Sequence, residues 1–111
     1  MTVVVNGQQI LTDDEGFIAD QSQWNCDVAL AIATQENIIA LTDAHWEVIN
    51  ILRQFYQDTQ MTLSNRHFVK MVAKTLGTEK GNSIYLLTLF PQSPAKLAAK
   101  IAGLPKPENC L

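Results

Sequence analysis

The residue best suited to chemistry in this chain is a thiol next to its C-terminal end. Cys110 is the penultimate of 111 residues, and it follows a segment in which Pro105 and Pro107 alternate with other residues. Each proline fixes its own φ angle, lacks a backbone N–H and favours an extended conformation in the residue before it. We therefore expect residues 103–111 to leave the body of the protein as a stiff polyproline II arm, whose thiol can enter a pocket of another protein.

A second thiol, Cys26, lies in a stretch whose pattern predicts a buried helix. The helix is expected over residues 20–36, with Asp20 or Ser22 as its cap. Its apolar residues fall on two adjacent faces, one with Trp24, Val28, Ala31 and Ile32 and the other with Cys26, Leu30 and Ala33. Free cysteine is usually a small core residue, so we expect Cys26 to be a core or semi-core residue and Cys110 to carry the thiol chemistry.

The other residue types indicate neither a metal site nor another cofactor. The two histidines, His45 and His67, fall on different predicted helices, without cysteine or carboxylate clusters at ligand spacing. The sequence also lacks a phosphate-binding glycine loop, a nucleophile elbow and a paired-carboxylate motif. We expect His45 to satisfy the first turn of a helix rather than to act as a base.

The sequence offers no dedicated base for Cys110. A free thiol has a pKa of ~8.5, so only a minority of it is thiolate near neutral pH. Lys96, Lys100 and Lys106 would favour the thiolate modestly. We therefore expect a partner protein to supply the environment that activates this thiol.

Length and composition are those of one ordinary globular domain. The chain is 47% hydrophobic and 17% charged, and no apolar run approaches the about 20 residues that span a bilayer. The N-terminal residues lack the basic segment of a signal peptide. We expect no membrane segment and a location in the reducing cytosol, where a disulfide between the two cysteines is not expected.

The two halves of the chain carry opposite charge. Residues 1–52 hold eight acids and no lysine or arginine, whereas residues 53–111 hold three acids and all eight bases. Arg66, Lys70 and Lys74 recur every four residues on one side of a predicted helix. A basic half suits an acidic partner or phosphates, or it forms solvated helix faces. The row of bases also leaves open a helix-turn-helix domain that binds nucleic acid.

Local signals predict a hairpin followed by helices. Asn6-Gly7, between apolar or β-branched runs at 2–5 and 8–11, indicates a hairpin with a type I′ turn. Beyond the helix at 20–36, the sequence predicts helices over 43–58, 65–76, 83–90 and 94–102, with Thr42, Ser64 and Ser93 as caps and Gly103 after the last. The expected fold is mainly α (α+β), a single domain with the hairpin (about 1–19) packed on an orthogonal bundle of about five short helices (about 20–102) and a flexible C-terminal arm (103–111).

Several strings in the sequence resemble the DsrC/TusE family of small sulfur-carrier proteins. They are Lys100-Ile101-Ala102-Gly103-Leu104-Pro105-Lys106-Pro107 followed by Cys110, Leu41-Thr42-x-x-His45-Trp46, Arg53 with Phe55-Tyr56, Glu79-Lys80-Gly81-Asn82-Ser83-x-Tyr85-Leu86, and Leu89-Phe90-Pro91. The resemblance runs from the hairpin to the last residue. It implies that a persulfide sulfur rides on Cys110 as the catalytic residue, and that Lys100 and Gly103–Pro107 serve the arm and partner docking.

The number of arm cysteines refines the resemblance. Members associated with sulfite reductase carry a second arm cysteine eleven positions upstream, where this chain has Ala99. The one-cysteine pattern is similar to the TusE branch of the family. It implies a sulfurtransferase that takes sulfur from a complex resembling TusBCD and passes it to a tRNA 2-thiouridylase resembling MnmA, with or without bound tRNA, for wobble-uridine thiolation. The alternative is a DsrC-like subunit of a sulfite-reductase or sulfur-oxidation system.

Four positions depart from the family pattern. Ile84 and Thr88 stand in place of arginines, Leu63 in place of proline and Ser93 in place of a common glycine. The first two departures remove positive charge near the base of the arm, so we expect the details of partner docking to differ.

Overall fold

The chain begins with a two-stranded antiparallel hairpin. In a computed structural model that describes residues 1–107, β1 (Thr2–Val5) pairs with β2 (Gln8–Leu11) along its whole length. Asn6 and Gly7 between them adopt φ angles of 50° and 80°. These are the positive angles that a type I′ turn needs at both central positions, so the predicted hairpin is confirmed.

Helices make up most of the rest of the described chain. A short 3-10 helix, η1 (Gln21–Gln23), precedes α1 (Cys26–Gln35), α2 (Asp43–Thr59), α3 (Asn65–Leu76), α4 (Ser83–Leu89) and α5 (Pro94–Ile101). The last four α-helices begin where the sequence predicts and end within one residue of the predicted position. Within residues 1–107, no helix is both long and apolar enough to cross a membrane.

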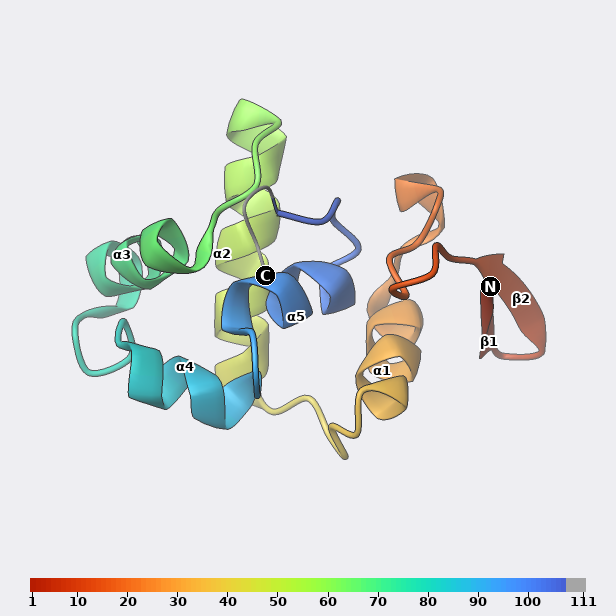
Figure 1. Cartoon of the computed structure of the whole chain (residues 1–111), viewed down its shortest axis with the longest axis horizontal. Coiled ribbons are helices and arrows are strands. Elements are labelled where there is room, and N and C mark those ends of the chain that lie inside the picture. The colour runs from red at the N-terminus through yellow and green to blue at the C-terminus, as the bar shows by residue number, and fades with distance from the viewer. Residues whose placement is uncertain (108–111) are drawn as a thin grey trace.

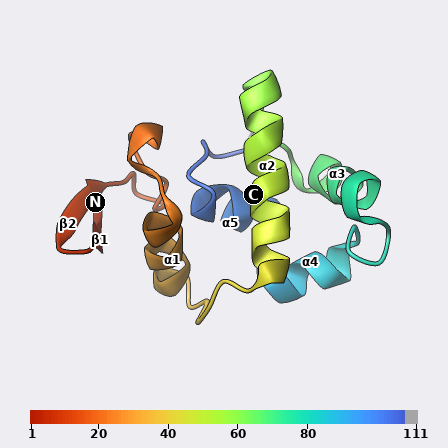
Figure 2. The same cartoon turned by 180° about the vertical axis from the view of Figure 1, so that it is seen from behind.

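The other helices are arranged around α5. It contacts α1, α2, α3 and α4, and the hairpin packs on α1. Figures 1 and 2 show α5 between α1 on one side and α2 and α3 on the other, with the hairpin at one end of the molecule. Ala95, Ala98 and Ala99 of α5 are all buried, and side chains this small let neighbouring helices approach closely.

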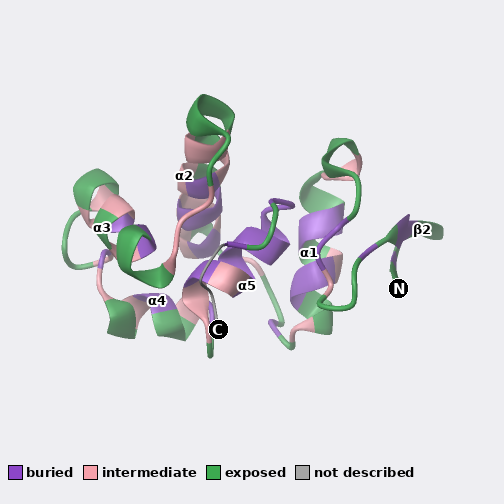
Figure 3. Ribbon diagram, turned by 45° about the horizontal axis from the view of Figure 1, so that its top comes forward, coloured by how far each residue is buried: buried purple, intermediate pink, exposed green. Residues whose placement is uncertain are grey.

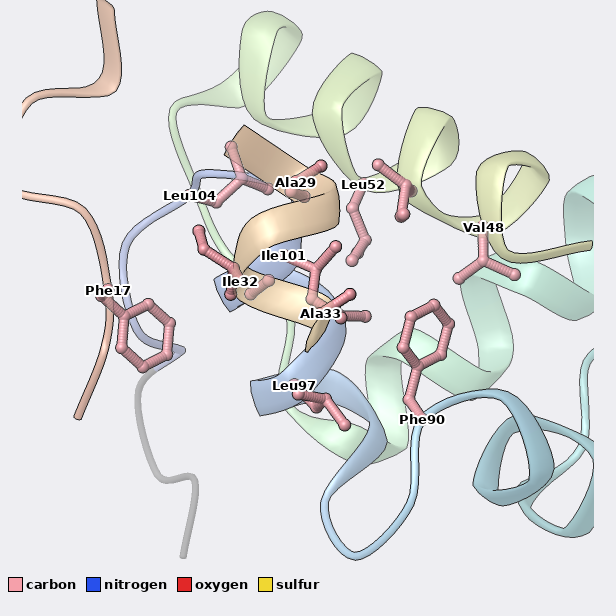
Figure 4. Close-up of a cluster of buried hydrophobic side chains, with 14 of the residues drawn as sticks. Phe17, Ala29, Ile32, Ala33, Val48, Leu52, Phe90, Leu97, Ile101 and Leu104 are labelled. Carbon is pink, nitrogen blue, oxygen red and sulfur yellow. The ribbon is translucent and has the colours of Figure 1, made fainter. Parts of the chain in front are cut away.

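The core fills the space between these helices. Buried residues line α5 and the inner sides of α1 and α2, whereas exposed residues cover the outer faces (Figure 3). The cluster in Figure 4 includes Ala29, Ile32, Ala33, Val48, Leu52, Phe90, Leu97 and Ile101. Phe17, from the loop after the hairpin, and Leu104, from beyond α5, belong to the same cluster. The segments before α1 and after α5 are therefore both tied to the core.

The prediction for the first helix is wrong at its N-terminal end. α1 begins at Cys26 because the side chain of Asn25 accepts a hydrogen bond from the Val28 N–H at 2.9 Å and caps the helix there. Asp20 instead caps the separate η1. Cys26 is therefore the first residue of α1 and is exposed, so the prediction that it is a core or semi-core residue is also wrong. The buried side of α1 consists of Val28, Ala29, Ile32 and Ala33.

His45 satisfies the first turn of α2, as predicted. Its Nδ1 accepts a hydrogen bond from the backbone N–H of Thr42 at 3.1 Å, and its Nε2 lies 3.0 Å from the carbonyl oxygen of Leu89. A neutral ring with its proton on Nε2 satisfies both contacts. Burial lowers the pKa of His45, and the hydrogen bond to Leu89 opposes that effect in part. His45 is thus a structural residue that joins α2 to the end of α4.

Candidate functional site

The residues that follow α5 fold back onto the body of the protein. Gly103, Leu104 and Pro107 are buried, whereas Pro105 and Lys106 are exposed. Leu104 also donates its N–H to the carbonyl oxygen of Ala99 at 3.0 Å. The prediction that the chain leaves the body at Gly103 is therefore wrong for residues 103–107, which we call the arm base. The prolines do keep this segment out of any helix, but Leu104 is apolar and stays in the core.

Trp24 forms the surface on which the arm base begins. Its indole Nε1–H donates a hydrogen bond to the carbonyl oxygen of Ile101, at the end of α5, at 2.8 Å. Gly103 has a φ angle of 73° and lies so close to the indole that an added Cβ would overlap the ring. Only glycine combines this backbone angle with so close an approach. One indole and one glycine therefore fix the direction in which the chain continues after α5.

Arg53 of α2 binds the same turn. Its Nη1 donates a hydrogen bond to the carbonyl oxygen of Ala102 at 2.7 Å, and its guanidinium lies 3.8 Å from the centroid of the Trp24 ring. A cation over an indole face at this distance is a favourable contact. Partial burial lowers the pKa of Arg53, but arginine remains charged in proteins. We call Trp24, Arg53 and the backbone of residues 101–103 the arm anchor.

Ion pairs hold the outer part of the arm base. Glu15, in the turn after the hairpin, lies 3.0 Å from the Nζ of Lys106 and 3.3 Å from the Nζ of Lys96 on α5. Hydrogen bonds from Lys106 and then from Lys96 lower the pKa of Glu15. These pairs are exposed, so each one stabilises the contact only weakly. Together they connect three segments that are distant in sequence.

Lys100 is buried in an ion pair. Its Nζ lies 2.7 Å from Oε1 of Glu36 and 5.4 Å from the centroid of the Phe17 ring. A lysine is costly to bury unless its charge is paired. The pair therefore ties the last turn of α5 to the residue that follows α1, and it directs Lys100 toward the body.

The structure brings most of the predicted docking residues together at the arm base but exposes few of them. Among Lys100 and Gly103–Pro107, only Pro105 and Lys106 are exposed. They line a groove with Tyr56, Gln60, Met61 and Thr62. The predicted catalytic residue, Cys110, lies outside the described residues, and its role stays a prediction.

Sequence reasoning missed three residues of this site, which are Trp24, Arg53 and Glu15. The apolar pattern assigns Trp24 to a helix face, Arg53 enters only as part of the family string with Phe55-Tyr56, and Glu15 belongs to no motif. Gly103 is the signal that could have led to Trp24, because a glycine that ends a helix often permits a close approach. Each of the three contacts the arm base or the turn that precedes it from a distant segment, and the smallest separation is the 49 residues between Arg53 and Ala102.

The described residues include one thiol, Cys26, and no group of side chains that could hold a metal ion. Within residues 1–107, no three His, Cys, Asp or Glu side chains lie close enough together to hold a metal ion. Cys26 is exposed at the start of α1, two residues beyond Trp24 and within electrostatic range of Arg53. The described geometry is that of a helical body that fixes the start of a C-terminal segment.

Comparison with known proteins identifies the family. The family model described as "DsrC like protein" matches residues 4–111. The chain is similar to a sulfurtransferase TusE homolog of Haemophilus influenzae, with 52% identity over 96% of this chain and 97% of that protein. It is 49% identical to sulfurtransferase TusE of Photorhabdus laumondii, over 98% and 97% of the two chains. The NMR structure of Allochromatium vinosum DsrC matches with a TM-score of 0.87 at 45% identity, over 99% of this chain and 97% of that one. This chain belongs to the DsrC-like family, and the resemblance seen in the sequence is confirmed.

We expect Gly103→Ala to displace the arm base and destabilise the protein. A non-glycine residue at a strained positive φ angle costs about 1–3 kcal/mol, and here the added Cβ would also overlap the indole of Trp24. Urea unfolding measures the total loss. Gly7→Ala is the matched control, because Gly7 also has a positive φ angle but open space around it. Equal losses in the two variants would contradict the role assigned to Trp24.

Removing the charge of Glu15 should loosen the arm base without unfolding the protein. Because the pKa of Glu15 lies below its ordinary value of 4.5, its ion pairs are complete above that pH and are lost as the pH falls through the lowered pKa. We expect faster hydrogen exchange at the Leu104 amide in Glu15→Gln at neutral pH, and in the unmodified protein only below pH 4.5, where the carboxylate becomes protonated. Asp14→Asn, at the neighbouring exposed acid, is the control. An unchanged exchange rate at the Leu104 amide in Glu15→Gln would show that these ion pairs do not hold the arm base.

Proposed function

We propose that this protein is a sulfur carrier, a sulfurtransferase that accepts persulfide sulfur on Cys110 and passes it to a tRNA 2-thiouridylase for wobble-uridine thiolation. The observation that carries the proposal is the arm anchor, which gives the segment ending in Cys110 a fixed origin on the body. The sequence of this chain is also about half identical, along nearly its whole length, to those of proteins named as sulfurtransferase TusE or its homolog. A carrier needs this combination of a stable body and one terminal thiol.

The length of the chain beyond the arm base sets where Cys110 can act. Cys110 is the third residue after Pro107, so with the arm base in place the thiol lies at most about 11 Å from Pro107 along the chain. If the arm base detaches and only the anchor holds, the span from Gly103 to Cys110 is seven residue steps, and the reach grows to about 25 Å. A partner with a shallow site can therefore use the docked arm base, whereas a deep site requires the arm base to detach, so that Lys106 leaves Glu15 and Leu104 leaves the core.

The transfer needs a thiolate, a persulfide and no further reactant. The Cys110 thiolate attacks the outer sulfur of the donor's persulfide, the donor's S–S bond breaks, and the donor cysteine leaves as a thiolate. Cys110 then carries the persulfide. The acceptor's thiolate attacks that outer sulfur in the same way and returns Cys110 to its thiolate. Neither step changes the overall oxidation state, so one cysteine is sufficient.

The surroundings of residue 99 are consistent with a one-cysteine cycle. Ala99 is 3% exposed, and its carbonyl oxygen accepts the hydrogen bond from Leu104 that starts the arm base. The two-cysteine mechanism of the sulfite-reductase-associated members requires a thiol at this position. The alternative function, as a DsrC-like subunit of such a system, has less support for that reason.

The proposed partners are a cytosolic donor complex resembling TusBCD and an acceptor resembling MnmA, with its tRNA bound. Both would meet the arm base at its exposed residues, Pro105 and Lys106, beside the groove lined by Tyr56 and Met61. Ile84 is 80% exposed on α4, where an arginine was expected from the resemblance. This apolar side chain suits a partner surface with fewer acidic groups at that point.

Intact-mass spectrometry tests the sulfur-carrier function directly. In the presence of the donor complex, the unmodified protein and Cys26→Ser should each gain the mass of one sulfur atom, and Cys110→Ser should gain none. Cys26 is a suitable control because it is exposed, so the comparison shows whether exposure of a thiol is enough for it to accept sulfur. Loading of Cys110→Ser, together with no loading of a folded Cys26→Ser, would overturn the assignment.

A further inference from the structure

Helix α3 of this acidic protein carries three positive charges and no negative one. α3 contains Arg66, Lys70 and Lys74 and no acid, and the surrounding stretch, residues 59–78, holds no Asp or Glu at all. The three bases, which we call the α3 row, are all exposed. The net charge of the whole chain is −3, so the charge of this surface is opposite in sign to that of the chain.

The bases of the α3 row form no ion pair with the described part of the chain, unlike four of the other lysines. The structure pairs Lys80 with Glu47, Lys96 and Lys106 with Glu15, and Lys100 with Glu36. Among the described residues, no carboxylate lies within ion-pair distance of the α3 row. The bases elsewhere thus hold segments of the body together, whereas these three are available to a ligand.

Helix geometry places these charges in a regular line. Each step of four residues advances about 6 Å along the axis and about 40° around it. The buried side of α3 is formed by Phe68 and Val72, so the row follows the solvent side of a helix at the end of the molecule away from the hairpin (Figure 1). The first turn has no acid and no side-chain cap, and the positive end of the helix dipole therefore adds to the same charge.

We propose that the α3 row is a docking surface for the phosphate backbone of RNA. An RNA strand presents one negative charge per nucleotide at a regular spacing, and the row presents its positive charges at a regular spacing as well. This inference rests on the proposed function, in which the acceptor modifies a tRNA. The row binds the backbone of the RNA that the acceptor holds, and it positions the body while the arm delivers sulfur. Phosphate contacts position a protein without reading sequence, so we expect binding without sequence preference.

Fluorescence anisotropy with the full-length protein and a labelled tRNA transcript measures the interaction. If the row neutralises three phosphates, the binding constant should fall roughly 20- to 40-fold between 50 and 200 mM salt. The variant Arg66→Gln/Lys70→Gln/Lys74→Gln should lose this salt-dependent binding. A transcript of scrambled sequence should bind the unmodified protein equally well.

A matched control separates the row from net charge. Gln8→Glu/Gln9→Glu/Gln35→Glu alters exposed residues of the hairpin and α1 and lowers the net charge by three, as the α3 variant does. We expect this control to keep most of the RNA binding. Equal loss of binding in both variants would show a general charge effect and would overturn the proposed surface.

Sulfur loading distinguishes this inference from the proposed function. The α3 variant should still gain one sulfur on Cys110 from the donor, because the row lies outside the arm anchor. The proposal fails if the unmodified protein shows no salt-dependent binding of the transcript, or if the α3 variant binds it equally well. Binding of polyglutamate through the row, without binding of RNA, would assign the surface to an acidic protein and would also overturn the proposal.

Discussion

The contact between Gly103 and the indole of Trp24 is the constraint on which the functional geometry depends. Trp24 precedes α1, Gly103 follows α5, and Arg53 of α2 covers the indole while it binds the carbonyl oxygen of Ala102. Three parts of the fold thus meet at one turn of backbone. Because the indole N–H also donates a hydrogen bond to the carbonyl oxygen of Ile101, at the end of α5, movement of the anchor would disturb the central helix. The start of the arm is therefore as firmly placed as the core.

Attachment weakens along the arm base from the anchor outward. The anchor combines close packing, two hydrogen bonds to backbone carbonyls and a cation over an indole ring, whereas the outer contact depends on exposed ion pairs between Glu15 and two lysines. Exposed pairs are weak and are screened by salt. Under the proposed function, a partner that replaces Glu15 at Lys106 and displaces Leu104 would lengthen the reach of Cys110 while the anchor holds.

Much of the fold could be predicted from the sequence because its signals are local. Asn6-Gly7 specifies a type I′ turn, and Thr42 and Pro94 mark helix starts that the structure confirms. The exposure of Cys26 and the packing of the arm base could not be predicted in this way. Both depend on contacts between segments that are distant in sequence. A proline pattern determines that a segment is extended, but the match between Leu104 and the core determines whether it leaves the body.

Under the proposed function, the body positions the thiol of Cys110 and a partner activates it. The pH dependence of Cys110 alkylation in the free Cys26→Ser protein distinguishes a passive thiol from a self-activated one. We expect the reactivity of a free cysteine, with a thiolate pKa within about one unit of ~8.5. A thiolate pKa well below 7 would show that the body activates its own thiol and would rule out the passive role.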